Sequence, residues 1–160
     1  MTLAHFPGRD PFRMAAWRAP RGMRGWLTDD SSLTARIRVR CGQFSLQVVF
    51  QGKGAVLPDE LAALGVHRHG SVWQREVLLI ADGEPVVFAR SLVAETTVPA
   101  AWHLLRGLGG RPLAAVLFDD PRVRRAPLEA ARLDARDSRW HHAARATGRD
   151  DLPALWARRS

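Results

Sequence analysis

The sequence is short of several residue types, and each shortage excludes a class of protein. Its 160 residues include one cysteine, Cys41, a single lysine, Lys53, and no tyrosine. One cysteine cannot form an internal disulfide, and no group of cysteines and histidines has metal-ligand spacing. No apolar run approaches the roughly 18 residues that span a bilayer, and the first residues lack the pattern of a secretory signal. We therefore expect a cytoplasmic protein with no disulfide, no metal ion and no stable membrane insertion.

The residues that are present fit one soluble globular domain. Hydrophobic residues make up 46% of the chain and charged residues 25%, which is a typical balance for such proteins. The net charge of +8 is compatible with nucleic-acid binding, because clustered cations displace counterions from phosphates. The 23 arginines, however, are spread along the whole chain. We therefore interpret them as solvated surface charge and expect no nucleic-acid partner.

Capping residues and apolar alternation predict an α+β fold. Helices are expected where an N-cap residue or a proline precedes apolar residues, and strands where apolar and polar residues alternate. Residues 1–25 are expected to form an irregular lead-in with a short helix around 11–18. Further helices are expected over 33–38, from Pro58 to Gly65 and over 99–108. Strands are expected over 43–51 and over 121–133, and 111–118 could be helix or strand. The prediction is a single antiparallel sheet with flanking helices, formed by one domain over 26–160.

The strongest local signal is a β-hairpin. The runs VWQREVLLI (72–80) and PVVFARSLV (85–93) are rich in strand-forming residues and flank the tetrapeptide ADGE. Asp-Gly between two such runs is typical of a two-residue hairpin turn. With Asp82 and Gly83 in the turn, Ala81 pairs with Glu84, and counting outward places Arg75 opposite Arg90.

That register puts both arginines side by side on an otherwise apolar face. Directly opposed like charges destabilise a sheet, and an unpaired buried cation is costly. Three interpretations stay open: the arginines bind an anionic ligand through its carboxylates, they form internal salt bridges with Glu76 or another carboxylate, or the face is exposed. Glu76 is expected on the opposite face from Arg75, because side chains alternate along a strand.

Three segments resemble the chorismate pyruvate-lyase family: WLTDDSSLTARIR from Trp26, VWQREVLLIADGEPVVFARSLV from Val72, and LLRGLGGRPLAAVLF from Leu104. They occur in the family's order, and the resemblance runs from Trp26 to the C-terminus. It implies an antiparallel sheet with the ligand enclosed on one face. It also implies that a monomer removes pyruvate from chorismate without a cofactor. The product, 4-hydroxybenzoate, is the first committed precursor of ubiquinone.

The resemblance also implies a set of site residues. Arg75 matches the arginine that grips the ring carboxylate of the substrate. Leu33 and Leu113 match positions that bind the ligand through the main chain. Arg90 matches an arginine of the second hairpin strand, near the leaving pyruvyl group, so Arg75 and Arg90 are the catalytic candidates. Ala114 stands where the family usually has glycine, which affects how closely the backbone can approach the ligand.

The C-terminal segment departs from the family pattern. LWARRS (155–160) matches a segment that two further strands follow in the family, and the last of them carries a glutamate. We therefore expect the closing hairpin and its glutamate to be missing and the lyase activity to be impaired. A looser alignment places Leu152–Trp156 on the last strand, with no acid at the glutamate's position.

Two other functions stay open beside the lyase. One is a ligand-binding domain of the same fold that binds an aromatic carboxylate without converting it, as in the effector domains of certain bacterial transcription regulators. Residues 1–25 are too few for the DNA-reading helices that precede such domains. The other is an inactive remnant of the enzyme.

Overall fold

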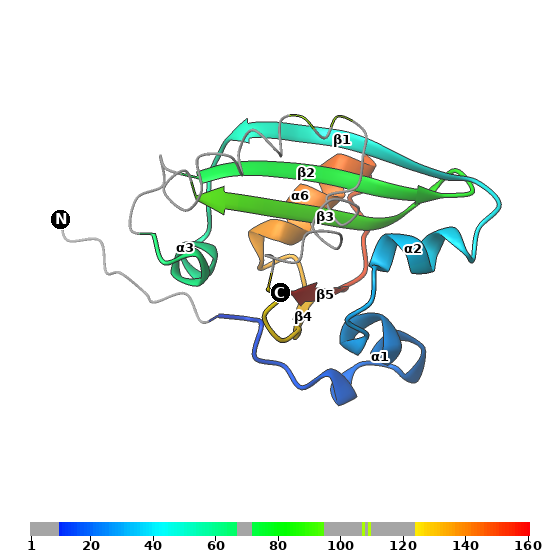
Figure 1. The fold of residues 1–160 in the computed structure, drawn as a ribbon, viewed down its shortest axis with the longest axis horizontal. Helices are drawn as coiled ribbons and strands as arrows, with labels where there is room; N and C mark the ends of the chain where they lie inside the picture. Colours follow the sequence, from blue (N-terminus) through cyan, green and yellow to red (C-terminus); the bar gives the residue numbers. More distant parts are fainter. Residues whose placement is uncertain (1–9, 67–71, 95–106, 108, 110–123) are drawn as a thin grey trace.

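A three-stranded antiparallel sheet carries the residues of the predicted hairpin (Figure 1). The structure is a computed structural model, and it describes residues 10–66, 72–94, 107, 109 and 124–160. Within them, β1 (Phe44–Lys53), β2 (Val72–Ala81) and β3 (Glu84–Ala94) pair in the order β1-β2-β3. The predicted strand over 43–51 and the predicted hairpin are confirmed.

The hairpin turn has the geometry that Asp-Gly favours. Asp82 and Gly83 both have positive φ, 51° and 86°, as a tight two-residue turn requires. Ala81 pairs with Glu84, as predicted. Asp82 also ties the turn to the start of β1, because its Oδ1 accepts a hydrogen bond from the backbone N–H of Gln43 at 2.8 Å, and its own N–H donates to the Gln43 carbonyl at 2.8 Å.

The predicted register beyond the turn is wrong. A bulge in β3 skips Val86, so Ile80 pairs with Pro85 and Leu79 with Val87. One extra residue on one strand moves every later partner by one position and changes the face on which it lies. As a result Arg75 pairs with Ser91, Glu76 pairs with Arg90, and the two arginines do not lie side by side.

Two short helices follow the predicted capping signals. Helix α2 (Leu33–Arg38) begins after Ser32, whose hydroxyl accepts a hydrogen bond from the Ala35 N–H at 3.3 Å. Helix α3 (Pro58–Leu64) begins with its proline and ends at Gly65, which has a φ of 65°. Both predictions are confirmed.

Helix α1 (Arg21–Thr28) was not predicted. An irregular segment was expected up to residue 25, with a helix around 11–18. The structure instead has a 3-10 turn, η1 (Ala16–Arg18), and α1 after it. Gly22 and Gly25 weaken the local helix propensity. Tertiary packing compensates, because Leu27 is buried in a cluster with Ala19 and Ala130.

The C-terminal part forms a second, two-stranded sheet. Strand β4 (Glu129–Leu133) confirms only the end of the strand expected over 121–133, because residues 124–128, which include Pro127, form no strand. It pairs with β5 (Leu155–Arg159), and helix α6 (Ser138–Thr147) lies between them in the chain. Neither β5 nor α6 was predicted. The α+β class is confirmed, but the described strands form two antiparallel sheets rather than one.

Helices lie against both faces of the three-stranded sheet. Val77 and Leu79 of β2 form a buried cluster with Ile37 of α2. The opposite face meets α6 (Figure 1), where His142 contacts Glu76. The helix predicted over 99–108 and the segment 111–118 lie outside the described residues, apart from Gly107. In the described part of the chain, no helix is long and apolar enough to cross a membrane.

Candidate functional site

Arg75 is the most deeply buried charged side chain of the described residues. It lies in the middle of β2 with 2% of its surface exposed. Its Nη2 donates a hydrogen bond of 2.6 Å to the carbonyl oxygen of Gly109. Burial lowers the pKa of Arg75, but a guanidinium stays protonated in proteins. The site therefore contains a permanent positive charge inside the fold.

The surroundings of Arg75 change from apolar to polar along the sheet. At its own register position Arg75 lies between Gln51 of β1 and Ser91 of β3. The next row on the same face is apolar and consists of Val48, Val77 and Ala89. This face can accommodate a ligand with an apolar ring and an anionic end, because an arginine fork binds a carboxylate with two parallel hydrogen bonds.

Leu33 lies on the same side of the sheet as Arg75. It is the first residue of α2 and packs against the cluster of Ile37, Val77 and Leu79. The structure therefore brings α2 over the face of β2 that carries Arg75. Leu113 and Ala114 lie outside the described residues. Gly109 was not predicted as a site residue, since only the folded chain places its carbonyl oxygen at Arg75.

Arg90 lies on the other face of the sheet, in a network of buried charges. Its Nε and Nη2 donate to the two carboxylate oxygens of Glu60 at 3.0 and 3.2 Å, and its Nη1 donates to Glu76. Nη2 also donates to the Ala55 carbonyl at 2.5 Å. The internal salt-bridge interpretation therefore applies to Arg90, and the structure does not bring Arg90 and Arg75 together.

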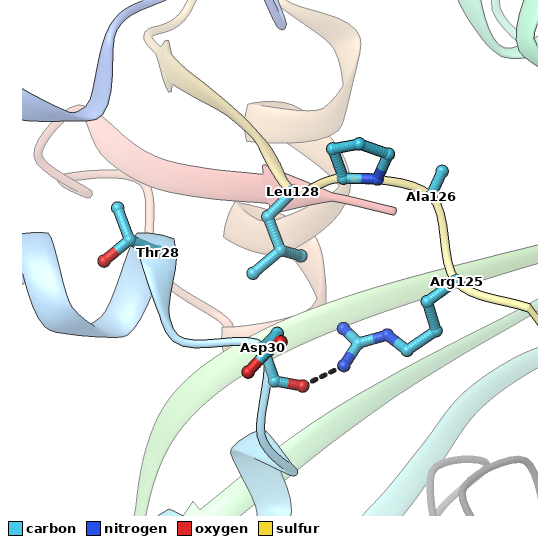
Figure 2. A pocket seen from close by; sticks show the side chains of 6 residues that line it. Thr28, Asp30, Arg125, Ala126 and Leu128 are labelled. Carbon is cyan, nitrogen blue, oxygen red and sulfur yellow. Dashed lines mark hydrogen bonds between the residues drawn. The ribbon is translucent and has the colours of Figure 1, made fainter.

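A hollow of about 670 Å³ lies beside the link between α1 and α2 (Figure 2). Figure 2 shows the Arg125 guanidinium reaching the Asp30 carbonyl, to which it donates a hydrogen bond. The lining residues are Thr28, Asp30, Arg125, Ala126, Pro127 and Leu128. Arg75 is not among them, so among the described residues the hollow and the buried arginine are separate features.

An arginine of the second sheet also contacts the segment that links α1 and α2. Arg158 of β5 donates from Nη1 to the carbonyl oxygens of Trp26 and Asp29, at 3.1 and 2.6 Å. Burial lowers the pKa of Arg158, and the nearby cations Arg125 and Arg36 lower it further. The backbone of the segment that leads into Leu33 is therefore anchored by hydrogen bonds from the side chain of Arg158.

The histidines form no metal site in the part of the chain that the structure describes, where no cluster of three His, Cys, Asp or Glu side chains could hold an ion. His141 contacts the Ala135 carbonyl at 2.8 Å and His142 contacts Glu76 at 2.9 Å. Both lie on α6. His67 and His69 lie outside the described residues.

Comparison with known proteins identifies the family. The chorismate lyase family model matches residues 15–160. The chain is 56% identical to a probable chorismate pyruvate-lyase of Aromatoleum aromaticum, over 89% of this chain and 78% of that protein. It is likewise 56% identical to one of an Azoarcus species, over 89% and 77%, and 44% identical to one of Thiobacillus denitrificans, over 91% and 77%. The chain belongs to the chorismate lyase family, as its sequence motifs indicated.

Proposed function

We propose that this protein is a chorismate pyruvate-lyase, which converts chorismate into 4-hydroxybenzoate and pyruvate and so supplies ubiquinone biosynthesis. The family membership and the names of the relatives at 56% identity support this function. The observation that carries it in the structure is the buried guanidinium of Arg75 at the polar end of an apolar sheet face. Chorismate matches that arrangement with a carbocyclic ring that bears a carboxylate.

The reaction requires orientation and charge stabilisation rather than a cofactor. The ether bond between the ring and the enolpyruvyl group breaks, and its electrons leave with the enolpyruvate. The ring loses a proton and becomes aromatic, and the enolpyruvate takes up a proton and becomes pyruvate. Aromatisation makes the reaction favourable, so the protein has to hold the ring and stabilise the leaving charge. We propose that Arg75 grips the ring carboxylate and that the main chain at Leu33 and Leu113 completes the contact.

The direct catalytic role that the resemblance implies for Arg90 stays a prediction. The guanidinium of Arg90 is bound by Glu60 and Glu76 on the face away from Arg75, which supports a role in positioning rather than direct contact with the substrate. The impaired activity expected from the C-terminal departure from the family pattern also stays a prediction. It is tested by appending the closing strands of a relative after Ser160 and comparing the rates of pyruvate release.

We further propose that the protein acts as a cytoplasmic monomer on small molecules, without a nucleic-acid partner. The contacts of its arginines support the absence of a nucleic-acid partner, because several of these side chains are engaged inside the fold. Arg90, Arg139 and Arg159 bind carboxylates, and Arg158 binds backbone carbonyls. These side chains are not presented as a continuous basic surface.

Pyruvate release from chorismate tests the proposed function directly. The purified protein is expected to produce pyruvate, measured by a coupled dehydrogenase, and 4-hydroxybenzoate in equal amounts and above the spontaneous rate. The variant Arg149→Ala, which removes an exposed cation paired with Asp151, should release pyruvate at the same rate as the wild type. A folded protein that binds 4-hydroxybenzoate but releases no pyruvate would instead support the non-catalytic binding domain.

A further inference from the structure

A network of buried charges lies directly behind Arg75. Glu60, Glu76 and Arg90 have 7–8% of their side chains exposed, and His142 contacts the same Glu76 oxygen as Arg90, at 2.9 Å. Glu76 follows Arg75 in β2, so its side chain points to the opposite face of the sheet. The charged network and the proposed carboxylate site therefore share one short piece of backbone.

That piece of backbone lies next to an irregularity in the strand pairing. Between β1 and β2 the register shifts so that Val48 pairs with Val77 and Phe50 with Glu76, which leaves Val49 as an extra residue. A bulge disrupts the ladder of backbone hydrogen bonds and bends the strand that contains it. The regular ladder is thus interrupted where the position of Arg75 is set, and side-chain ties have more to contribute there.

The side chains of the network connect β2 to β3, to α3, to the segment ahead of α3 and to α6. Arg90 joins β3 to Glu76 of β2, to Glu60 of α3 and to the Ala55 carbonyl ahead of α3. His142 adds α6 through the same Glu76. Four of the five N–H groups of Arg90 are used in these contacts. None of these four donors is available to a ligand on the opposite face.

We infer that Arg90 is a positioning residue that acts through Glu76: together they hold β2 so that Arg75 meets the substrate carboxylate, and Arg90 does not itself touch the substrate. The substrate part of this inference rests on the proposed function. A lysine cannot replace the arginine, because a single ammonium lacks the planar fork that reaches Glu60 and Glu76 at once.

The test compares Arg90→Lys, Glu76→Gln and the double variant, with Arg149→Ala as the control, in proteins shown to be folded by circular dichroism. Each single variant should raise KM for chorismate and Kd for 4-hydroxybenzoate about fivefold or more. The kcat should stay within about twofold, because Arg75 binds substrate and transition state alike. The KM and Kd of the double variant should be no higher than those of the more affected single variant, because both substitutions remove the same link between Arg90 and Glu76. Glu60→Gln serves as a second probe if Glu76→Gln does not fold.

Direct contact between Arg90 and the substrate gives a different pattern. In that case Arg90→Lys lowers kcat, whereas Glu76→Gln leaves KM and Kd within about twofold, or the two losses add in the double variant. Either result overturns the inference.

A measurement without ligand separates this inference from the proposed function. In protein labelled with 15N-arginine, the Nε–H signal of Arg75, assigned with Arg75→Lys, should shift or broaden in Arg90→Lys and Glu76→Gln but not in Arg149→Ala. An unchanged signal in both variants overturns the inference whatever the enzyme does with chorismate. A shifted signal in a protein that releases no pyruvate leaves the inference standing and refutes the proposed function.

Discussion

Arg75 and Arg90 belong to one hairpin, yet the two faces of the sheet treat them differently. Arg75 lies on the face built from Val77, Leu79 and α2, and it donates to the Gly109 carbonyl. Arg90 lies on the face toward α3 and α6, bound by Glu60 and Glu76. Burial of an arginine is common to both and identifies no function by itself. The surroundings distinguish a guanidinium suited to a ligand from one that holds the fold together.

The second sheet repeats the arrangement around Arg90. Arg139 of α6 binds Asp137 and Asp59 at 2.7 Å each. Arg159 of β5 binds Asp59 as well, at 3.3 Å, and also Asp10 and Glu129. Asp59 and Glu60 are neighbours in the first turn of α3, so this helix connects both networks. Burial lowers the pKa of Arg75. Burial would also lower the pKa of Arg139, but the hydrogen bonds that Arg139 donates to Asp137 and Asp59 outweigh it and raise the pKa.

The largest expected effect on stability is at Arg90. Arg90→Met leaves the buried carboxylates of Glu60 and Glu76 without their shared cation, and breaking a buried pair in this way costs about 3–5 kcal/mol. Urea unfolding should show this loss in the free energy of unfolding. A loss below about 1 kcal/mol would mean that the network contributes little to the fold and would remove the contrast with Arg75.

Arg75→Met should affect ligand binding more than the stability of the fold. Binding of 4-hydroxybenzoate should weaken by about 2–5 kcal/mol, because a buried charged contact with the ligand is lost. The free energy of unfolding should fall by only about 1–3 kcal/mol, because the Gly109 carbonyl loses the hydrogen bond that Arg75 donates. Calorimetry and urea unfolding of the same preparation measure both quantities. Unchanged binding would exclude Arg75 from the site.

The parts of the fold that were predicted correctly depend on a few neighbouring residues. The Asp82-Gly83 turn, the Ser32 cap of α2 and the proline and glycine that bound α3 each act within one turn of chain. The alternation in β2 places Arg75 on the face of Val77 and Leu79, which needs no knowledge of the partner strand. These features could be predicted from the sequence because short-range geometry determines them.

The parts that were missed depend on contacts across the fold. The bulge at Val86 reversed the face of Arg90, and no local signal beyond Pro85 marks it. Helix α6 is held by contacts with distant residues. Arg139 donates to Asp59 as well as to its neighbour Asp137, and the Trp140 indole N–H donates to the Pro153 carbonyl at 3.1 Å. The role of Gly109 at Arg75 likewise depends on residues 34 positions apart.

Acid should weaken the ion pairs that Arg139 and Arg159 form with carboxylates. Burial alone would raise the pKa of Asp137, but hydrogen bonds from the side chain and backbone of Arg139 hold it below the ordinary value of 3.8. Asp10, bonded to Arg159 and to the Phe12 N–H, is lowered in the same way. A carboxyl group with a depressed folded pKa contributes stability above its unfolded pKa and loses it as pH falls through the folded pKa. Stability should therefore fall below about pH 4.

Asp137→Asn sharpens that test because it removes one of the titrating groups. Its free energy of unfolding should be lower than that of the wild type at pH 6, and the difference should shrink as the pH falls from 4 to 2. Urea unfolding at a series of pH values measures this. A constant difference across that range would show that the carboxylate charge of Asp137 does not contribute to stability.

The smallest effect on stability and binding is expected at an exposed arginine. Arg149 pairs with Asp151 at 3.3 Å, but 52% and 82% of the two side chains are exposed. Water screens such a pair, and ordering two mobile side chains cancels most of the remaining attraction. Arg149→Ala should therefore change the free energy of unfolding by less than about 0.5 kcal/mol and leave 4-hydroxybenzoate binding unaltered. A loss comparable with that of Arg90→Met or Arg75→Met would mean that net positive charge, rather than the placement of individual arginines, governs stability and binding.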